Sequence, residues 1–303
     1  MYAWLYANRV RIKGATEAKY TRIIETHILP ELGGVKINKL DANTINTFLD
    51  LKLKSGGLRS EAALSSSYVR TMAIVIEAAI NYAVKEGLCA TLKTPINKPP
   101  VPKNNIPILN KSSEITLTQK MINDSSLVAI GVLLALQGGL RIGEVCALKW
   151  NDIDFDARII HIKHTISRVP CPNMKQKTML IIDTPKTNSS IRDIPMPTSL
   201  QNILSVAYET RTSEYVVSSS HNFVGTRTFD YQYRKLLKCY GMQIISFHTL
   251  RHTYATRCAE AGMDAKTLSQ LLGHASSNTT LNIYVHPSME VAMNHIENIF
   301  CSA

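Results

Sequence analysis

Apolar residues in the first part of the chain recur at the spacing of one face of an α-helix. The clearest run follows the i, i+3, i+4, i+7 rule through Val69, Met72, Ala73, Ile76, Ala79, Ile80, Ala83 and Val84. The hydroxyl groups of Ser65–Ser67 can cap the start of this helix, and Gly87 can end it. Two further amphipathic segments are GATEAKYTRIIETHIL and DANTINTFLDLKL, the second opened by Asp41. The pattern predicts a small bundle of about four helices over residues 1–92.

The periodicity changes after residue 112. The run LVAIGVLLALQ predicts a buried helix, Gly138–Gly139 interrupt it, and RIGEVCAL resumes a helical pattern. RIIHIKHTISR (158–168), TMLIIDT (178–184) and IRDIPM (191–196) are rich in β-branched residues, which predicts a three-stranded antiparallel sheet. Helical patterns follow these strands to the end of the chain. The expected fold class is therefore α+β, mostly α with a small antiparallel β-sheet.

Between the two regions lies KTPINKPPVPKNNIPILNK (93–111), which holds five of the chain's twelve prolines. Proline has no backbone N–H and fixes its own φ, so a stretch this rich in proline cannot continue a helix or a strand ladder. We expect a stiff, extended linker here. The expected organisation is a helical domain over residues 1–92, a linker over 93–111, and a second domain over 112–303 that ends in a tail helix.

The composition is that of a globular protein with an excess of positive charge. Hydrophobic residues make up 45% and charged residues 19% of the 303 positions, which is enough apolar content for two domain cores. The formal net charge of +11 favours a polyanionic partner such as a nucleic acid, because spread lysines and arginines replace the counterions of a phosphate backbone. A basic protein without such a partner is the alternative that charge alone leaves open.

The cysteines and the apolar runs indicate the cellular compartment in which the protein is expected. The six cysteines stand apart with no CxxC pair, which argues against a zinc ribbon or a disulfide framework and for reduced thiols. The longest apolar run, LVAIGVLLAL (127–136), suits a buried helix and is too short to span a membrane. The first residues lack the basic-then-apolar order of a signal peptide. The sequence therefore predicts a cytoplasmic protein without a membrane partner.

The stretch SFHTLRHTY (246–254) gathers two histidines and an arginine. His248 and His252 have the i, i+4 spacing of an HExxH zinc helix, but Thr249 stands where that motif has its glutamate, and no third ligand follows at a matching spacing. His248 also lies next to a predicted helix start at Ser246, so the two imidazoles need not share a face. We therefore expect neither a metal site here nor a cofactor.

A phosphate site accounts for more of the sequence. Arg141 lies at a predicted helix start, where its guanidinium can grip phosphate oxygens in a bidentate manner while Glu144, one turn on, fixes its orientation. Arg251, three residues after His248, offers a second guanidinium group that could bind phosphate oxygens. Lys186, in TPKTNSS, lies at a turn between two predicted strands, where a mobile ammonium can reach a leaving group.

Two more residues complete the series. His274 in LLGHAS lies at a predicted helix end, and Tyr284 in NIYVHP lies ten residues further on. Each residue has a plain alternative: a surface Arg–Glu pair worth well under ~1 kcal/mol, an exposed turn lysine, a helix cap, an aromatic at the edge of a core. Together they form the ordered series Arg…Lys…His-x-x-Arg…His…Tyr, which chance explains poorly.

The segments GGLRIGEVCALKWNDID, TPKTNSSIRDIPMP, FHTLRHTYAT and LLGHASSNTTLNIYVH carry this series. In them the chain resembles the tyrosine recombinase (phage integrase) family. The resemblance covers nearly all of residues 112–303, as the catalytic domain, and the helical region 1–90 is similar to the family's core-binding domain. The hairpin PKTNSSIRDIPMP is similar to that of integrases from temperate phages and integrative conjugative elements of Gram-positive bacteria. Larger members carry a further N-terminal arm-binding domain, so we expect either a short member or part of a longer one.

The resemblance implies DNA strand exchange without a metal or an energy-supplying cofactor. Tyr284 would attack the scissile phosphate, form a 3′-phosphotyrosyl link and release a 5′-hydroxyl, so that the covalent link stores the phosphodiester energy for rejoining. Lys186 would protonate the leaving oxygen, and His248 would be the acid–base partner of Tyr284.

The same resemblance assigns the remaining residues of the series. Arg141 and Arg251 would stabilise charge on the non-bridging phosphate oxygens. His274 would donate a hydrogen bond to the phosphate, and Glu144 would support Arg141. His252 is common in the family's motif, but we expect a structural role for it on the inward face of its helix.

The partners implied are double-stranded DNA at paired att or target core sites, a homotetramer on those sites, a directionality factor and a host bending protein, with the protein associated with the nucleoid. Groove contacts are expected from the bundle helices and from residues 226–238, although aromatic residues at helical spacing are more often core. The tail after Tyr284 carries an apolar stripe of Met289, Ala292, Met293, Ile296, Ile299 and Phe300. That stripe predicts a helix packed on its own domain or, as the resemblance implies, on a neighbouring protomer.

Other functions share parts of this pattern. A type IB topoisomerase-like nicking-closing enzyme uses the same chemistry, and a chromosome-dimer-resolving recombinase uses the same domains. A non-catalytic DNA-binding protein would explain the charge but not the ordered series. A zinc hydrolase would use His248 and His252 as ligands.

Overall fold

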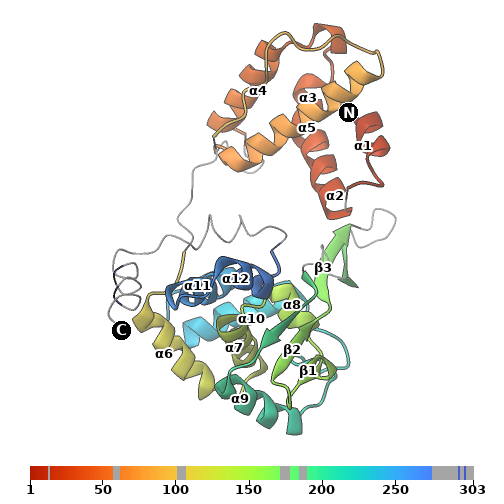
Figure 1. Cartoon of the computed structure of the whole chain (residues 1–303). Helices are drawn as coiled ribbons and strands as arrows, with labels where there is room; N and C mark the ends of the chain where they lie inside the picture. Colours follow the sequence, from red (N-terminus) through yellow and green to blue (C-terminus); the bar gives the residue numbers. More distant parts are fainter. Residues whose placement is uncertain are drawn as a thin grey trace. The chain divides into compact units, whose positions relative to one another are not determined.

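The computed structural model describes residues 1–12, 14–56, 62–100, 107–170, 178–183 and 190–274, together with positions 293 and 297. The chain divides into two compact units, whose helices and strands are drawn in Figure 1. The first unit comprises Met1–Asn104 with Arg168–Met179, and the second comprises Asn105–Ser167 with Leu180–Ala303. No helix among the described residues is long and apolar enough to cross a membrane.

The first unit is a helical bundle, as the periodicity predicts. Its elements are α1 (Tyr2–Ala7), α2 (Gly14–Ile23), a π-helical turn (Ile24–Ile28), α3 (Leu29–Leu32), a 3₁₀ turn (Ile37–Lys39), α4 (Ala42–Lys54) and α5 (Ser66–Lys85). The predicted apolar stripe of α5 is buried from Val69 to Ala83 and forms the centre of the bundle core. Side chains of α1, α2 and α4 complete that core.

The predicted capping residues mark the ends of these helices. The side chain of Asp41 accepts a hydrogen bond from the backbone N–H of Thr44 at 2.8 Å, and that of Ser65 accepts one from Tyr68 at 3.3 Å. Gly87 follows α5 at φ 72°, a left-handed conformation that favours glycine and ends the helix. Both helix starts and the helix end were read correctly from the sequence.

The proline-rich segment 93–111 is attached at both of its described ends. Ile96 is buried in the core of the first unit. Leu109 is buried in the core of the second unit, where its backbone N–H donates to Oγ1 of Thr253 at 2.9 Å. Residues 101–106 lie outside the described part of the chain. The ends of the segment are therefore packed parts of the two units.

The second unit is built around one buried helix. Its helices are α6 (Lys111–Ile122), α7 (Leu127–Gly138), α8 (Ile142–Ala147), a 3₁₀ turn (Trp150–Asp152), α9 (Thr198–Glu209), α10 (Thr226–Cys239), α11 (Phe247–Glu260) and α12 (Ala265–Leu272). α7 packs against α6, α8, α9, α10 and α11. Because α7 is apolar on every side, as LVAIGVLLALQ predicts, it occupies the middle of the core.

The strands form two small sheets instead of the single three-stranded sheet that we expected. The first contains β1 (Ile153–Asp154), β2 (Ile159–Ile162) and β5 (Arg192–Pro195), antiparallel in the order β1-β2-β5. The second pairs β3 (Thr165–Pro170) with β4 (Thr178–Asp183). The predicted strand 158–168 is thus two strands, because Ile160 and Ile162 point into the core opposite β5, whereas the chain beyond His164 pairs with β4. The fold class, mostly helical with small antiparallel sheets, is confirmed.

α10 shows which aromatic residues of 226–238 serve the core. Phe229 and Tyr233 are buried against the rest of the second unit. Tyr231 is 69% exposed, and Arg227 and Arg234 are exposed on the same helix. Of these five residues, Tyr231, Arg227 and Arg234 are accessible to a partner, whereas Phe229 and Tyr233 are not.

Candidate active site

A sharp turn at Gly139 places Arg141 at the start of α8. α7 ends at Gly138, and Gly139 follows in the left-handed conformation at φ 66°. A Cβ atom at Gly139 would lie 2.6 Å from Cδ1 of Tyr254, so a larger residue would have to displace that ring. Arg141 then takes the N-cap position of α8. The helix break and restart predicted from the glycine pair are confirmed.

Glu144 holds Arg141 from the first turn of α8. Its Oε1 accepts a hydrogen bond from Nη1 of Arg141 at 2.7 Å, and its Oε2 accepts one from the backbone N–H of Arg141 at 2.8 Å. The Glu144 side chain is 2% exposed, so the surface ion pair that the spacing also allowed does not describe it. Burial raises the pKa of Glu144, but the hydrogen bonds and charges of Arg192 and Arg141 outweigh it and bring the pKa to about 2.

Arg192, which the sequence reasoning missed, is the second partner of Glu144. Its Nη1 and Nη2 donate to Oε1 and Oε2 of Glu144 at 3.0 Å and 2.9 Å, a bidentate pair between β5 and α8. The side chain of Arg192 is 5% exposed. Along β5 buried and exposed residues alternate, and Arg192 occupies a buried position beside Ile194. An arginine on the inward side of a short strand needs a buried acid, and that pattern in IRDIPM was the available signal.

Arg251 lies deeper than Arg141. It is 1% exposed in the middle of α11. Its Nη1 donates to the carbonyl oxygen of Gly139 at 2.6 Å, and its Nη2 donates to the carbonyl oxygen of Leu272 at the end of α12. Arg251 thereby ties the turn after α7 to the end of α12. The structure brings the two arginines of the predicted series into one region of the second unit.

The two histidines of α11 touch each other. The ring centroids of His248 and His252 lie 4.3 Å apart at an angle of 76°. The expectation that they need not share a face was wrong, because the helix continues through both residues. Burial, with the positive charges of Arg251 and Arg141, lowers the pKa of His248 against the opposing charge of Glu144. His252 is half-buried, and burial, His248 and Arg251 lower its pKa to about 4.

His274 joins the same group from the end of α12. It follows Gly273, which is left-handed at φ 62° and ends the helix. Burial, followed by the charges of Arg251, Arg141 and Arg192, lowers the pKa of His274 to about 4. His274 is therefore a neutral imidazole at pH 7, able to donate one hydrogen bond and accept another.

Two residues of the predicted series, Lys186 and Tyr284, lie outside the described residues. The tail stripe that begins at Met289 also lies outside them, except for Met293, which is 61% exposed. The described members of the series, Arg141, Glu144, His248, Arg251 and His274, all belong to the second unit.

The charge and proton states of this region suit an anion with several acceptor oxygens. Arg141 is 34% exposed and brings a guanidinium to the surface, with Arg251 buried behind the same turn. The lowered pKa values of His248, His252 and His274 favour the neutral form of their imidazole rings. A phosphate diester supplies non-bridging oxygens for the guanidinium and an acceptor for an imidazole N–H. Within the described residues, no group of three or more His, Cys, Asp or Glu side chains has a metal-binding arrangement.

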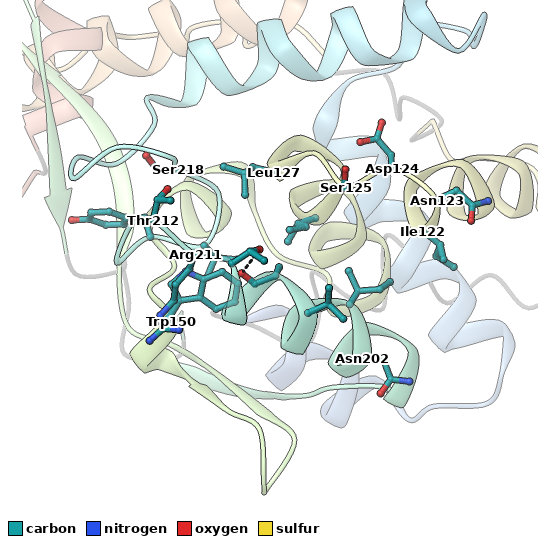
Figure 2. Close-up of a pocket in the computed structure, with 17 residues that line it drawn as sticks. Ile122, Asn123, Asp124, Ser125, Leu127, Trp150, Asn202, Arg211, Thr212 and Ser218 are labelled. Atoms are coloured by element: carbon teal, nitrogen blue, oxygen red, sulfur yellow. Dashed lines mark hydrogen bonds between the residues drawn. The ribbon is translucent and has the colours of Figure 1, made fainter.

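The second unit also contains a cavity lined by other residues. It has a volume of about 420 Å³ and is lined mainly by apolar side chains, with Trp150, Asn202 and Arg211 among its labelled residues in Figure 2. The side chain of Arg211 lies over the ring of Tyr208, 3.6 Å from its centroid. None of the predicted site residues lines this cavity, so the two features are distinct.

Residues 101–291 match the sequence profile of the phage integrase family, a range that contains every member of the predicted series. The chain belongs to this family. Residues 1–53 of this integrase also match the phage integrase N-terminal SAM-like domain. The resemblance inferred from the motifs is confirmed, and with it the enzyme class: a tyrosine recombinase, which cleaves and rejoins DNA strands with a tyrosine nucleophile.

Two relatives of the integrase differ in how much of the chain they match. It is 31% identical to a XerC-like tyrosine recombinase of Caldanaerobacter subterraneus subsp. tengcongensis, over 99% of this chain and 81% of that protein. It is 30% identical to the transposase of transposon Tn916 from Enterococcus faecalis, over 55% of this chain and 44% of that protein. The chain is thus similar along nearly its whole length to the first and over about half its length to the second.

Solved structures share the fold of the integrase. The Tn1549 transposon integrase, in complex with transposon right end DNA, superposes with a TM-score of 0.78 at 21% identity, covering 97% of this chain and 98% of the other. A lambda integrase tetramer bound to a Holliday junction gives a TM-score of 0.62 at 19% identity, covering 92% and 76%. At these identities the likeness concerns the fold.

Proposed function

We propose that this tyrosine recombinase cleaves and rejoins double-stranded DNA at paired core sites, and that it thereby integrates and excises a mobile element. The observation that carries the proposal is the arrangement of Arg141, held by buried Glu144, beside Arg251 and three histidines with lowered pKa values. The net charge of +11 supports a DNA substrate. The similarity to proteins named for the transposons Tn916 and Tn1549 supports a mobile element.

The chemistry follows from the protonation states. A tyrosine with a pKa of about 10 is a poor nucleophile until a base takes its proton. His248, whose pKa is lowered, is neutral at pH 7 and can accept the proton from Tyr284 as the phenol oxygen attacks the scissile phosphate. Lys186 protonates the 5′-oxygen that leaves, and the 3′-phosphotyrosyl link conserves the bond energy for rejoining.

Arg141 and Arg251 form the proposed phosphate clamp, and their guanidinium charges are positioned before the substrate binds. Arg141 and Arg251 face charge that develops on the non-bridging oxygens, and Glu144 and the backbone carbonyls hold both guanidinium groups in position before substrate arrives. His274 donates a hydrogen bond to the same phosphate. No metal or nucleotide is required in this scheme, because two arginines supply the charge and the covalent link supplies the energy.

Assembly on DNA completes the proposal. A lambda integrase tetramer has been solved on a Holliday junction, and we propose a homotetramer for this recombinase on its paired sites as well. The apolar tail after Tyr284 would pack on a neighbouring copy. A directionality factor and a host bending protein would choose between integration and excision, and the reaction would take place on DNA of the nucleoid.

The test is a trapped covalent intermediate. Purified protein is mixed with a library of nicked duplexes, from which the short cleaved strand diffuses away and prevents rejoining. Wild type should form an SDS-resistant protein–DNA adduct, and Tyr284→Phe should bind DNA without forming it. Tyr254→Phe is the matched control, because burial raises the pKa of Tyr254 and keeps its hydroxyl protonated. An adduct that survives Tyr284→Phe would move the nucleophile elsewhere.

Sequencing the attached strands separates the proposal from two related functions. Chromosome-dimer resolution is the second candidate, because a relative that matches 99% of the chain is XerC-like. Strands that map to the ends of an integrated element support integration, and strands from one chromosomal site support dimer resolution. Adducts on unrelated sequences, with relaxation of supercoils, would indicate a nicking-closing enzyme.

A further inference from the structure

The end of α12 accepts hydrogen bonds from three arginines that come from three different elements. The pairs are Nε of Arg192 to the carbonyl of Leu271 at 2.5 Å, Nη2 of Arg251 to the carbonyl of Leu272, and Nη2 of Arg141 to the carbonyl of Gly273 at 3.1 Å. The last carbonyls of a helix have no partner within it and carry the negative end of its dipole, so guanidinium groups stabilise them. Three consecutive peptide groups immediately before His274 are thereby held by side chains.

Arg192 differs from the other two arginines in what its nitrogen atoms contact. Both Nη atoms donate to Glu144, Nη1 also donates to the carbonyl of Ser190 at 3.2 Å, and Nε donates to the carbonyl of Leu271. Its side chain is 5% exposed, whereas that of Arg141 is 34% exposed. Arg192 therefore contacts the residues that hold Arg141 and His274, and all three of its guanidinium nitrogen atoms already donate to acceptors within the protein.

We propose that Arg192 is a positioning residue for strand cleavage, acting on Arg141 through Glu144 and on His274 through the end of α12. The inference rests on the proposed function. With Arg192 in place, each oxygen of Glu144 is shared between two donors, so the carboxylate has one orientation and Arg141 has one acceptor geometry. Without Arg192 the carboxylate can rotate about its bond to the chain, and the Leu271 carbonyl loses its partner.

The test compares two substrates that differ in the charge of the scissile group. One carries an ordinary phosphodiester and the other a neutral methylphosphonate, in which a methyl group replaces one non-bridging oxygen. Arg192→Gln should slow formation of the covalent adduct on the phosphodiester by about 10–10²-fold, the usual effect of a small misplacement of a charged group. On the methylphosphonate the gap to wild type should largely close, because the methyl group removes one of the two charged oxygens that the guanidinium of Arg141 would stabilise in the transition state. Arg141→Ala should show the same substrate dependence.

Two variants control for folding and charge. Arg158→Gln removes an exposed arginine at the turn between β1 and β2, whose Nη1 donates to Oγ1 of Thr198 at 3.1 Å, and it should cleave both substrates at the wild-type rate. Arg192→Lys keeps the charge beside Glu144 but loses the fork, and it should show a smaller loss with the same substrate dependence. If Arg192→Gln does not fold, Arg192→Lys provides the result.

The outcomes are distinct. Equal slowing on both substrates would make Arg192 a purely structural residue, and an unchanged rate on the phosphodiester would remove any role for it; each result overturns the inference while leaving the recombinase function intact. Absence of an adduct with wild-type protein would instead overturn the proposed function, and the inference with it.

Discussion

The helical bundle and the candidate active site each bury charged side chains, but in different ways. In the bundle the Lys52 side chain, 9% exposed, pairs with Glu31, whose side chain is 37% exposed and still reaches water. In the second unit Glu144 and Arg192 are 2% and 5% exposed, and Arg251 is 1% exposed. A pair with one end in water is inexpensive to form, whereas a dry cluster of charges forms at a desolvation cost that apolar residues would avoid. The difference supports the positioning role that we propose for this buried cluster.

The largest expected difference is between the effects of replacing Lys186 and Lys52 on the rate of strand cleavage. Lys186→Ala should slow strand cleavage by about 10²–10⁴-fold, as for loss of a general acid, whereas Lys52→Ala should leave the cleavage rate of bound DNA unchanged. A 5′-bridging phosphorothioate, whose sulfur leaves without protonation, should largely restore cleavage by Lys186→Ala in a single-turnover assay. Rescue of Arg251→Ala, and not of Lys186→Ala, would show that the acid has been misassigned.

The next contrast concerns the arginine clamp. Arg141→Ala should reduce cleavage by about 10²–10³-fold, or ~3–4 kcal/mol of transition-state stabilisation, with DNA binding by the rest of the protein retained. Wild-type cleavage should continue in excess EDTA, because the arginines supply the charge that a metal would otherwise provide. Cleavage that requires a divalent ion in single-turnover assays would contradict this account.

The two glutamate pairs, one partly exposed and one buried, predict different losses of stability. Glu144→Gln should lower the free energy of unfolding of the second unit by about 3–5 kcal/mol, because it leaves buried guanidinium groups uncompensated. Glu31→Gln should cost the bundle only about 0–1 kcal/mol. The two tryptophans allow each unit to be followed alone in urea: Trp4→Phe leaves buried Trp150 as the reporter of the second unit, and Trp150→Phe leaves Trp4 for the first. Equal losses in both units would remove the distinction.

The smallest expected effect is the change with pH in the stability that Glu144 contributes, which should develop gradually as pH falls. The folded-state pKa of Glu144 is lowered to about 2, below the value of about 4.3 for an unfolded glutamate. The stability that this shift contributes, about 3 kcal/mol, is complete above the unfolded pKa and is lost as pH falls toward the folded pKa. The difference in unfolding free energy between wild type and Glu144→Gln should therefore shrink between pH 4 and pH 2. A difference that stays constant over this interval would mean that Glu144 is not held ionised by its partners.

The helices of the bundle were predictable because the sequence features that define them lie within a few residues of one another. The stripe of α5 repeats within one helix, and the caps at Asp41 and Ser65 act over three residues. The same holds for the turn at Gly139 and for the Arg141–Glu144 pair, which lie within one helical turn of each other. These features needed no knowledge of what packs against them.

The missed features depend on contacts between distant segments. Arg192 meets Glu144 across 48 positions and Leu271 across 79, and periodicity carries no information about such partners. The division of 158–168 into two strands depends on the partner of each half, because Ile159–Ile162 pair with β5 and β3 pairs with β4. The inward position of Arg192 in β5 was the one clue in the sequence, because a charge facing a core requires a partner.

The central claim, that Tyr284 becomes covalently linked to DNA in this site, is tested most directly by mapping the linked residue. Adducts trapped on nicked DNA are digested with nuclease and protease, and the peptides that retain a nucleotide are identified by mass spectrometry. The account predicts a single modified peptide, carrying a 3′-phosphotyrosyl nucleotide on Tyr284. Modification at Tyr254 or any other residue, or an adduct on a serine, would contradict it.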